Sequence, residues 1–219
     1  ITLNADKGQV KNESAGDVFA LNGNVTFHAK GDVINKGDVV ALNGDSVTDK
    51  GAINFISTHG NVSNYDNFKL VDGSDFVFED DKPKLVFNGA SGYVIGSNAV
   101  VKFNQGTDYS KDGKYILTDA DLTMKALEGY IYNDMAIVSK KDVTLVSGKD
   151  LTIGTNVAFV ESEGDVIVQS LKGNVKLQQG SKVLSNNGDI VIDGYSGVDI
   201  IDGSTLEADK GSISVVSTN

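Results

Sequence analysis

Apolar and polar residues alternate in short runs along the whole chain, and glycine with Asp or Asn separates one run from the next. Alternation with a period of two is typical of half-buried β-strands. Gly-Asp, Gly-Asn, Asn-Gly and Asp-Gly are turn formers, because glycine accepts a positive φ and Asn or Asp binds nearby backbone groups. The alternation is clearest at Val143/Leu145, Leu151/Ile153, Val166/Val168, Val175/Leu177, Ile190/Ile192 and Ile213/Val215.

The strands repeat with a period of about 23 residues. Within one series, the first inward-facing residues of equivalent strands are 23, 24 and 23 residues apart, and two further series have spacings of 24 and 23. Three interleaved series with one period predict three strands in each coil, with equivalent strands of successive coils pairing in parallel. The series are Val143, Val166, Ile190 and Ile213; Leu151, Val175 and Val198; and Phe159, Val183 and Leu206.

The N-terminal half follows the same rule with spacings of 20 to 24 residues, and the middle continues it less clearly. We therefore predict an all-β fold, a right-handed parallel β-helix with three strands and about 23 residues per coil. About 9 to 10 coils would make a rod roughly 45 Å long. The N-terminal series are Val18, Val39, Val62 and Leu85; Val25, Val47, Leu70 and Val94; and Val33, Ile53, Phe76 and Val100; the middle positions are Ile116, Leu122, Ile131 and Ile137.

The pattern predicts one β-helix segment over residues 1–219, with a less regular region at 104–135. Residues 104–115 read as a loop. A helix from Asp119 to Gly129 is one interpretation of the following stretch, and a wider corner within the solenoid is the one we favour. Both ends of the chain lie within strand-like runs, so we expect an internal segment of a longer array.

Amino-acid composition excludes several kinds of partner and binding site. The net charge of −11 opposes binding to nucleic acid and to acidic lipid headgroups. All 19 basic residues are lysines, and cysteine is absent, which excludes disulfides and thiolate metal sites. A chain without cysteine also suits export in an unfolded state, because no disulfide can block the passage. No apolar run reaches the ~18 residues of a transmembrane helix.

Candidate chemistry is sparse. Clustered carboxylates can act as acid and base or bind calcium, but such pairs normally need burial, which their polar surroundings do not predict. His28 and His59 are isolated, in an outward-facing position and in a corner. We therefore predict no catalytic, cofactor-binding or metal-binding residues, and keep a polysaccharide lyase or hydrolase as a third hypothesis. The densest acidic group is Asp72, Asp75, Glu79, Asp80 and Asp81, and Asp49 lies 23 residues before Asp72.

Tyrosines supply the one candidate interaction patch, Tyr93, Tyr130 and Tyr132. If Ile131 faces inward, Tyr130 and Tyr132 face outward, and exposed tyrosine is a common anchor at interfaces. A receptor-binding adhesin module that uses the 90–135 surface is accordingly the second hypothesis. Scattered amphipathic surface residues are the alternative interpretation, and we favour it.

The GDV, GNV and GDI corners followed by VTL or VKL strands resemble the repeats of filamentous haemagglutinin-like exoproteins, most strongly over Lys141 to Val216. These are large bacterial surface proteins exported by two-partner secretion, and they include adhesins and the stalks of contact-dependent growth-inhibition effectors. The family's secretion domain usually carries an Asn-Pro-Asn-type motif, which a chain with Pro83 as its only proline cannot contain. If the resemblance holds, this is therefore an internal segment.

The resemblance implies a secreted location on the bacterial outer surface, an outer-membrane transporter as partner during export and a cell-surface receptor as a further partner. It implies no catalytic residues and no cofactor. Our leading hypothesis is a non-enzymatic stalk segment that projects an adhesive or toxin-bearing tip. We expect it to be monomeric and to be continuous with the rest of a longer chain.

Overall fold

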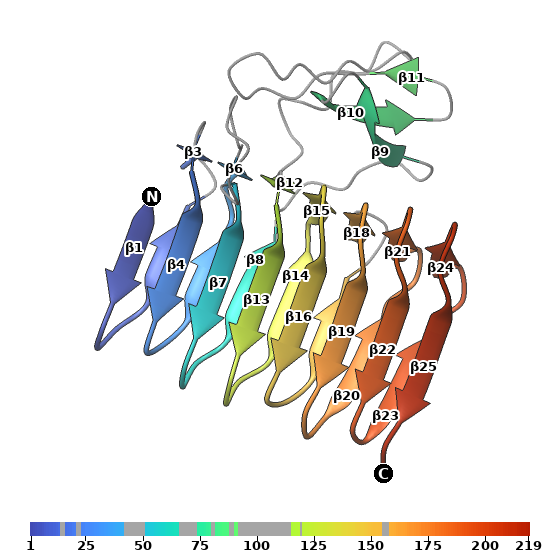
Figure 1. Ribbon diagram of the computed structural model, residues 1–219. Coiled ribbons are helices and arrows are strands. Elements are labelled where there is room, and N and C mark those ends of the chain that lie inside the picture. Colours follow the sequence, from blue (N-terminus) through green and yellow to red (C-terminus); the bar gives the residue numbers. More distant parts are fainter. Residues whose placement is uncertain are drawn as a thin grey trace.

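The computed structural model describes residues 1–13, 16–20, 23–41, 51–65, 74–79, 82–87, 90–91, 115–118, 120–154 and 158–219. Within these ranges every regular element is a β-strand, and nothing helical reaches the length and apolarity that crossing a bilayer requires. Figure 1 shows most strands stacked along one axis, from the N-terminal strand in blue to the C-terminal strand in red. The prediction of an all-β parallel solenoid is confirmed.

Three parallel sheets run the length of the solenoid, with one strand from each sheet in a coil. Sheet A contains β1 (Thr2–Ala5), β4 (Val25–Ala29), β7 (Ile53–Ser57), β13 (Leu122–Ala126), β16 (Val143–Ser147), β19 (Val166–Ser170), β22 (Ile190–Gly194) and β25 (Ile213–Ser217). Sheet B contains β2 (Val10–Asn12), β5 (Val33–Asn35), β8 (Val62–Tyr65), β14 (Ile131–Asp134), β17 (Leu151–Ile153), β20 (Asn174–Leu177) and β23 (Gly197–Ile200). Sheet C contains β3 (Val18–Ala20), β6 (Val39–Ala41), β12 (Tyr115–Thr118), β15 (Ala136–Ser139), β18 (Phe159–Ser162), β21 (Lys182–Ser185) and β24 (Thr205–Ala208).

Equivalent residues of successive coils form files, which are stacks of residues paired from strand to strand. The C-terminal half follows the predicted register, with one exception. In sheet C, Val160 pairs with Val183, whereas Phe159 pairs with Lys182, so the predicted series was wrong by one residue at this strand. Two predicted files are confirmed in full: Val143, Val166, Ile190 and Ile213 in sheet A, and Leu151, Val175 and Val198 in sheet B.

The N-terminal series were largely wrong. Val18 pairs with Val39 as predicted, but Val62 belongs to sheet B, where it pairs with Val33. Val25 pairs with Ile53, so these two residues share a file that the prediction had divided between two series. Phe76 and Leu85 lie in a separate antiparallel sheet of β9 (Ser74–Glu79), β10 (Lys82–Phe87) and β11 (Ala90–Ser91). Val47, Leu70, Val94 and Val100 lie outside the described residues.

The chain leaves the solenoid after β8 and rejoins it at β12. Strands before this excursion pair directly with strands after it: β6 with β12, β7 with β13 and β8 with β14. Ile53 and Leu122 are adjacent in one file although they are 69 residues apart, which is three times 23. Among the residues that the structure describes, the longest sheet therefore has eight strands, fewer than the 9 to 10 coils predicted from chain length.

The region predicted to be less regular contains ordinary coil strands where the structure describes it. Residues 122–126 form β13, in the place where a helix was one interpretation, and residues 131–134 form β14. Leu122 and Ile131 are both fully enclosed in the core. Residues 104–114 lie outside the described part of the chain.

Inward-facing side chains of the three sheets form one apolar core along the solenoid axis. The rings of Phe27 and Phe55 stack there with their centroids 4.8 Å apart. In sheets A and B inward and outward residues alternate, whereas central strands of sheet C are buried on both faces, as at Val40 and Val138. Strands covered on both faces read as continuous apolar runs, and "VVA" of β6 is one of them.

Candidate functional site

Aspartate side chains at one corner of the solenoid bind successive coils together. The corner lies between sheet C of one coil and sheet A of the next, and the residue before each sheet A strand is equivalent from coil to coil. Oδ1 of Asp142 accepts the backbone N–H of Asp165 (2.9 Å), and Oδ1 of Asp165 accepts that of Asp189 (2.8 Å). Oδ1 of Asp189 then accepts the N–H of Ser212 (2.8 Å). We call each such bond, from a corner side chain to the backbone of the next coil, a staple.

The corner between sheets A and B carries a second line of staples. Oδ1 of Asp32 accepts the N–H of Asn61 (2.9 Å), and Oδ1 of Asn61 accepts that of Tyr130 (3.1 Å). Further along the rod, Oδ1 of Asp150 accepts the N–H of Asn174 (2.9 Å). These bonds use backbone donors that strand pairing leaves open at a turn, and the aspartate bonds are strengthened by the charge of the acceptor.

At several Gly-Asp and Gly-Asn corners, namely at Gly60, Gly164, Gly173 and Gly188, the glycine leaves room for the stapling aspartate oxygen of the previous coil. A Cβ on Gly164 would collide with Oδ1 of Asp142, and one on Gly188 would collide with Oδ1 of Asp165. Positive φ, which the Gly-Asp and Gly-Asn pairs predict, is not the general cause: among the described glycines it occurs at Gly23, Gly51, Gly180 and Gly203, and of these only Gly23 precedes Asp or Asn. The repeated glycine therefore reflects the close approach of successive coils.

Buried hydroxyl groups complete the corners. Ser185 Oγ donates to the carbonyl of Gly164 in the previous coil (2.8 Å) and accepts the N–H of Gly188 in its own corner (3.0 Å). Ser170 Oγ has the same arrangement with the carbonyl of Lys149 (2.5 Å) and the N–H of Gly173 (3.0 Å). Each hydroxyl thus joins two coils and also closes its own turn, so its burial leaves no unmatched polar group at these two corners.

Four asparagines form a buried ladder inside the N-terminal coils. Nδ2 of Asn12 donates to Oδ1 of Asn35 (2.9 Å), Nδ2 of Asn35 to Oδ1 of Asn64 (2.8 Å), and Nδ2 of Asn64 to Oδ1 of Asn133 (2.6 Å). Nδ2 of Asn133 ends the ladder on the carbonyl of Met135 (2.9 Å). The bond between Asn64 and Asn133 crosses the excursion, so it joins the coil before it to the coil after it.

The tyrosines predicted as an interaction patch occupy different environments. Tyr130 is 45% exposed and lies just before β14. Tyr132 lies on the outward face of sheet B between Ser63 and Thr152, and its hydroxyl donates to Oδ2 of Asp134 (3.1 Å). Tyr93 lies outside the described residues. Of this patch, the described part thus provides one exposed ring and one half-buried ring.

Tyr132 remains a neutral donor at physiological pH. Burial raises the pKa of its hydroxyl, and the charge of Asp134 and the hydrogen bond to it raise the pKa further, to about 12. An activated tyrosine nucleophile would need a lowered pKa. The hydroxyl of Tyr132 therefore serves as a hydrogen-bond donor to Asp134.

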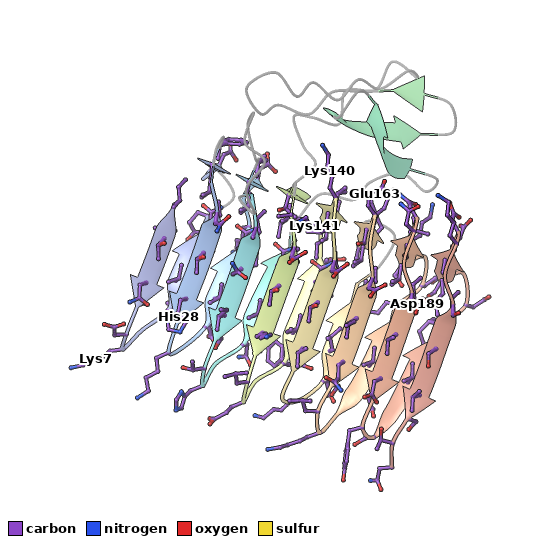
Figure 2. The ribbon with its side chains drawn as sticks, viewed as in Figure 1. Lys7, His28, Lys140, Lys141, Glu163 and Asp189 are labelled. Atoms are coloured by element: carbon purple, nitrogen blue, oxygen red, sulfur yellow. The ribbon has the colours of Figure 1, made fainter. Side chains whose placement is uncertain are left out.

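The other candidate groups remain apart where the structure describes them. Nδ1 of His28 lies 2.9 Å from Oδ1 of Asn4, and Nδ1 of His59 lies 3.0 Å from Oγ1 of Thr58. Asp75 and Glu79 lie in β9; Asp49, Asp72, Asp80 and Asp81 lie outside the described residues. No group of three or more His, Asp or Glu side chains in the described ranges is placed to hold a metal ion. Figure 2 shows His28 on a different coil from Lys140, Lys141, Glu163 and Asp189.

The repeat in the sequence predicted the corners, but not the bonds made there or the asparagine ladder. The ladder has a readable signal, since an apolar residue, any residue and then asparagine occur in that order at Val10–Asn12, Val33–Asn35, Val62–Asn64 and Ile131–Asn133. In the later coils the same file is apolar, with Ile153, Leu177 and Ile200. The staples also have a signal in the sequence, because Asp or Asn recurs directly before the first inward-facing residue of many strands in sheets A and B.

Comparison of the chain with protein-family models, with curated proteins and with solved structures finds no match.

Proposed function

We propose that this chain is a structural stalk segment of a large secreted bacterial surface exoprotein, and that it holds an adhesive or toxin-bearing tip away from the outer surface. The role is mechanical and involves no catalysis or cofactor. The observation that carries the proposal is the continuous line of aspartate staples from Asp142 through Asp165 and Asp189 to Ser212. These staples add side-chain bonds to a backbone ladder that already joins every coil to the next.

Stacked coils suit this role because reach increases linearly with coil number. Each coil contacts only its neighbours, so coils can be added without a change in the packing elsewhere. Bending the rod would stretch both the ladder and the staples on one side. Export through an outer-membrane transporter, with coils folding one after another as they emerge, fits the absence of cysteine from the sequence.

If the chain is a stalk, the length of the rod, and no particular surface group, should determine how efficiently a tag at its end is captured. The chain would be displayed on a bacterial outer surface with an epitope tag after Asn219, and capture by antibody-coated beads would be measured. Duplicating residues 166–189, one coil in sheet A register, should add ~4.8 Å of reach and increase capture, and deleting them should decrease it. Capture that does not change with coil number would refute the stalk role.

A receptor-binding adhesin module is the second candidate, and the exposure of Tyr130 favours it. A partly exposed aromatic ring supplies contact area at little cost in side-chain entropy. Replacing Tyr130 with Ser should then reduce binding to receptor-bearing cells while the circular dichroism spectrum is unchanged. The matched control is Tyr195→Ser, which removes a similarly exposed ring from a distant coil. Equal binding by both variants and the unchanged chain would exclude a role for Tyr130.

A further inference from the structure

We propose that the asparagine ladder selects the strand that pairs with β8 when the chain returns from the excursion. The ladder acts as a register device, because β14 is the strand whose inward-facing amide matches the amide of β8. This role goes beyond the stalk function. It concerns which strands pair during folding, so it can fail or succeed whether or not the rod carries a tip.

The excursion removes the short connection that fixes register elsewhere in the rod. Met135 alone joins β14 to β15, so the strand that follows β14 has no choice of position. Residues 66–114 stand between β8 and β12, and the entropy of closing so long a connection changes only slowly with its length. The connection therefore does not determine which of the later strands pairs with β8.

Backbone pairing and apolar packing also discriminate poorly among the later strands. Parallel ladders use the N–H and C=O groups that every strand has. β13 and β17 begin with the buried residues Leu122 and Leu151, where β14 begins with Ile131. Any of these three strands would thus cover Val62, the first residue of β8, with an aliphatic side chain of similar size.

The second inward-facing position of β8 does distinguish these strands. Asn64 is fully buried there, and its amide accepts from Nδ2 of Asn35 (2.8 Å) and donates to Oδ1 of Asn133 (2.6 Å). At the equivalent position β17 has Ile153, which has no acceptor, and β13 has Met124, whose sulfur is a weak one. Covering Asn64 with either strand would leave its buried N–H without a strong partner, which is costly in an apolar core.

The earlier members of the ladder fix the direction in which Asn64 presents its amide. Oδ1 of Asn64 accepts from Asn35, and Oδ1 of Asn35 accepts from Asn12, so every amide points its donor toward the coil that follows. Buried polar groups that must find one particular partner specify register in coiled coils, at a cost in stability. The ladder applies the same physics to the strands on the two sides of the excursion.

The ladder ends where this task is complete. Asn133 is the one buried asparagine after the excursion in the part of the chain that the structure describes. Its Nδ2 donates to the carbonyl of Met135 (2.9 Å), within the same coil, and the next coil places Ile153 in the same file. Later coils are joined by short connections and carry apolar residues in this file.

Cysteine pairs in this cysteine-free chain report which strand lies beside β8. Ser63 and Tyr132 pair on the outward face of sheet B, and the ~4.8 Å between adjacent strands is within the range of a disulfide. Ser63→Cys with Tyr132→Cys therefore reports the native pairing, and Ser63→Cys with Thr152→Cys reports β17 in the place of β14. Dilute chains are refolded from urea with oxidant present from the start, so that pairings lost at equilibrium are also captured.

With the ladder intact, the Tyr132 pair should crosslink within one chain and the Thr152 pair should not, as read on a non-reducing gel. In chains that also carry Asn64→Leu and Asn133→Leu, crosslinking of the Thr152 pair should increase by about tenfold or more, because no unmatched amide opposes that pairing. Asn133→Leu alone should give the same direction of change, since Asn64 then lacks an acceptor under either strand. An unchanged crosslinking pattern in both backgrounds would overturn the proposal.

Val62→Ala with Ile131→Ala is the matched control. These two residues pair in the same two strands and are buried, but they lie outside the ladder. The control removes apolar contacts and lowers stability, yet the Thr152 pair should remain uncrosslinked because the amides still match. An equal gain of Thr152 crosslinking in this control would show that the ladder only stabilises the junction, and the register role would then be rejected.

Discussion

Oδ1 of Asp165 accepts the backbone N–H of Asp189 at 2.8 Å, and the two residues are equivalent positions of adjacent coils. Asp165 in turn donates its own N–H to Asp142. A single aspartate is thus both acceptor to the coil above and donor to the coil below, which explains why Asp or Asn recurs at this corner.

Replacing Asp165 with Ala should lower the free energy of unfolding by about 1 kcal/mol, because the N–H of Asp189 loses its acceptor. Urea unfolding followed by circular dichroism measures the change. Asp165→Asn keeps an acceptor oxygen and is the control, so it should lie closer to the unchanged protein. Equal destabilisation by the two variants would mean that the carboxylate charge, and not the bond, stabilises the corner.

Gly188→Ala should destabilise the protein more than Asp165→Ala does, since its Cβ would collide with Oδ1 of Asp165 and with the backbone of Gly164. Adding Asp165→Ala to this variant removes the collision with Oδ1 and leaves those with backbone atoms of Gly164 and Asp165, so the double variant should lose less stability than the sum of the single changes. Gly8→Ala is the control, because a Cβ there has no atom within 4 Å. Additive effects would show that the collision with Asp165 is unimportant.

Asn64→Leu should cost about 2 to 4 kcal/mol, because it leaves Oδ1 of Asn133 and one N–H of Asn35 without a partner inside the core. The other N–H of the Asn35 amide keeps its bond to the carbonyl of Gly37. Replacing all four ladder asparagines with leucine should cost less than four times that amount, since the same file is apolar at Ile153 and Leu177. Chemical denaturation compares the variants. If the quadruple variant loses four times as much stability as Asn64→Leu, or more, the core cannot accommodate an apolar file at this position.

Stability should decrease as the pH rises from about 10 to about 12. The pKa of Tyr132 is raised from 10.0 to about 12 in the folded protein, so the folded state retains a proton that the unfolded state has lost over this range. The contribution is fully present below pH 10. Urea midpoints for the unchanged protein and Tyr132→Phe should therefore converge over this interval, and a constant difference between them would contradict the assignment.

The sequence predicted the architecture well where the coils are uninterrupted. Period and alternation located the Val143 and Leu151 files correctly, because each coil there differs from the next by at most one residue in length. The error at Phe159 has a local cause, since β18 is buried on both faces and alternation cannot distinguish Phe159 from Val160.

The N-terminal errors have a different cause. Ile53 and Leu122 are separated by three periods of 23 residues, so a periodic pattern can be drawn through the excursion without a visible break. The sequences of β9 and β10 also predict strands, and a strand pattern does not specify whether the strand pairs in parallel with a distant coil or antiparallel with its neighbour. The staples were not predicted because they depend on which residue lies one coil away.

Met135 alone separates β14 from β15, whereas residues 66–114 stand between β8 and β12 at the corresponding place. Strand pairing nevertheless continues across these residues, since β8 pairs directly with β14 and β6 with β12. The position between Tyr65 and Tyr115 is therefore an insertion site, where evolution can replace one inserted segment with another while the sequence of the surrounding coils stays the same.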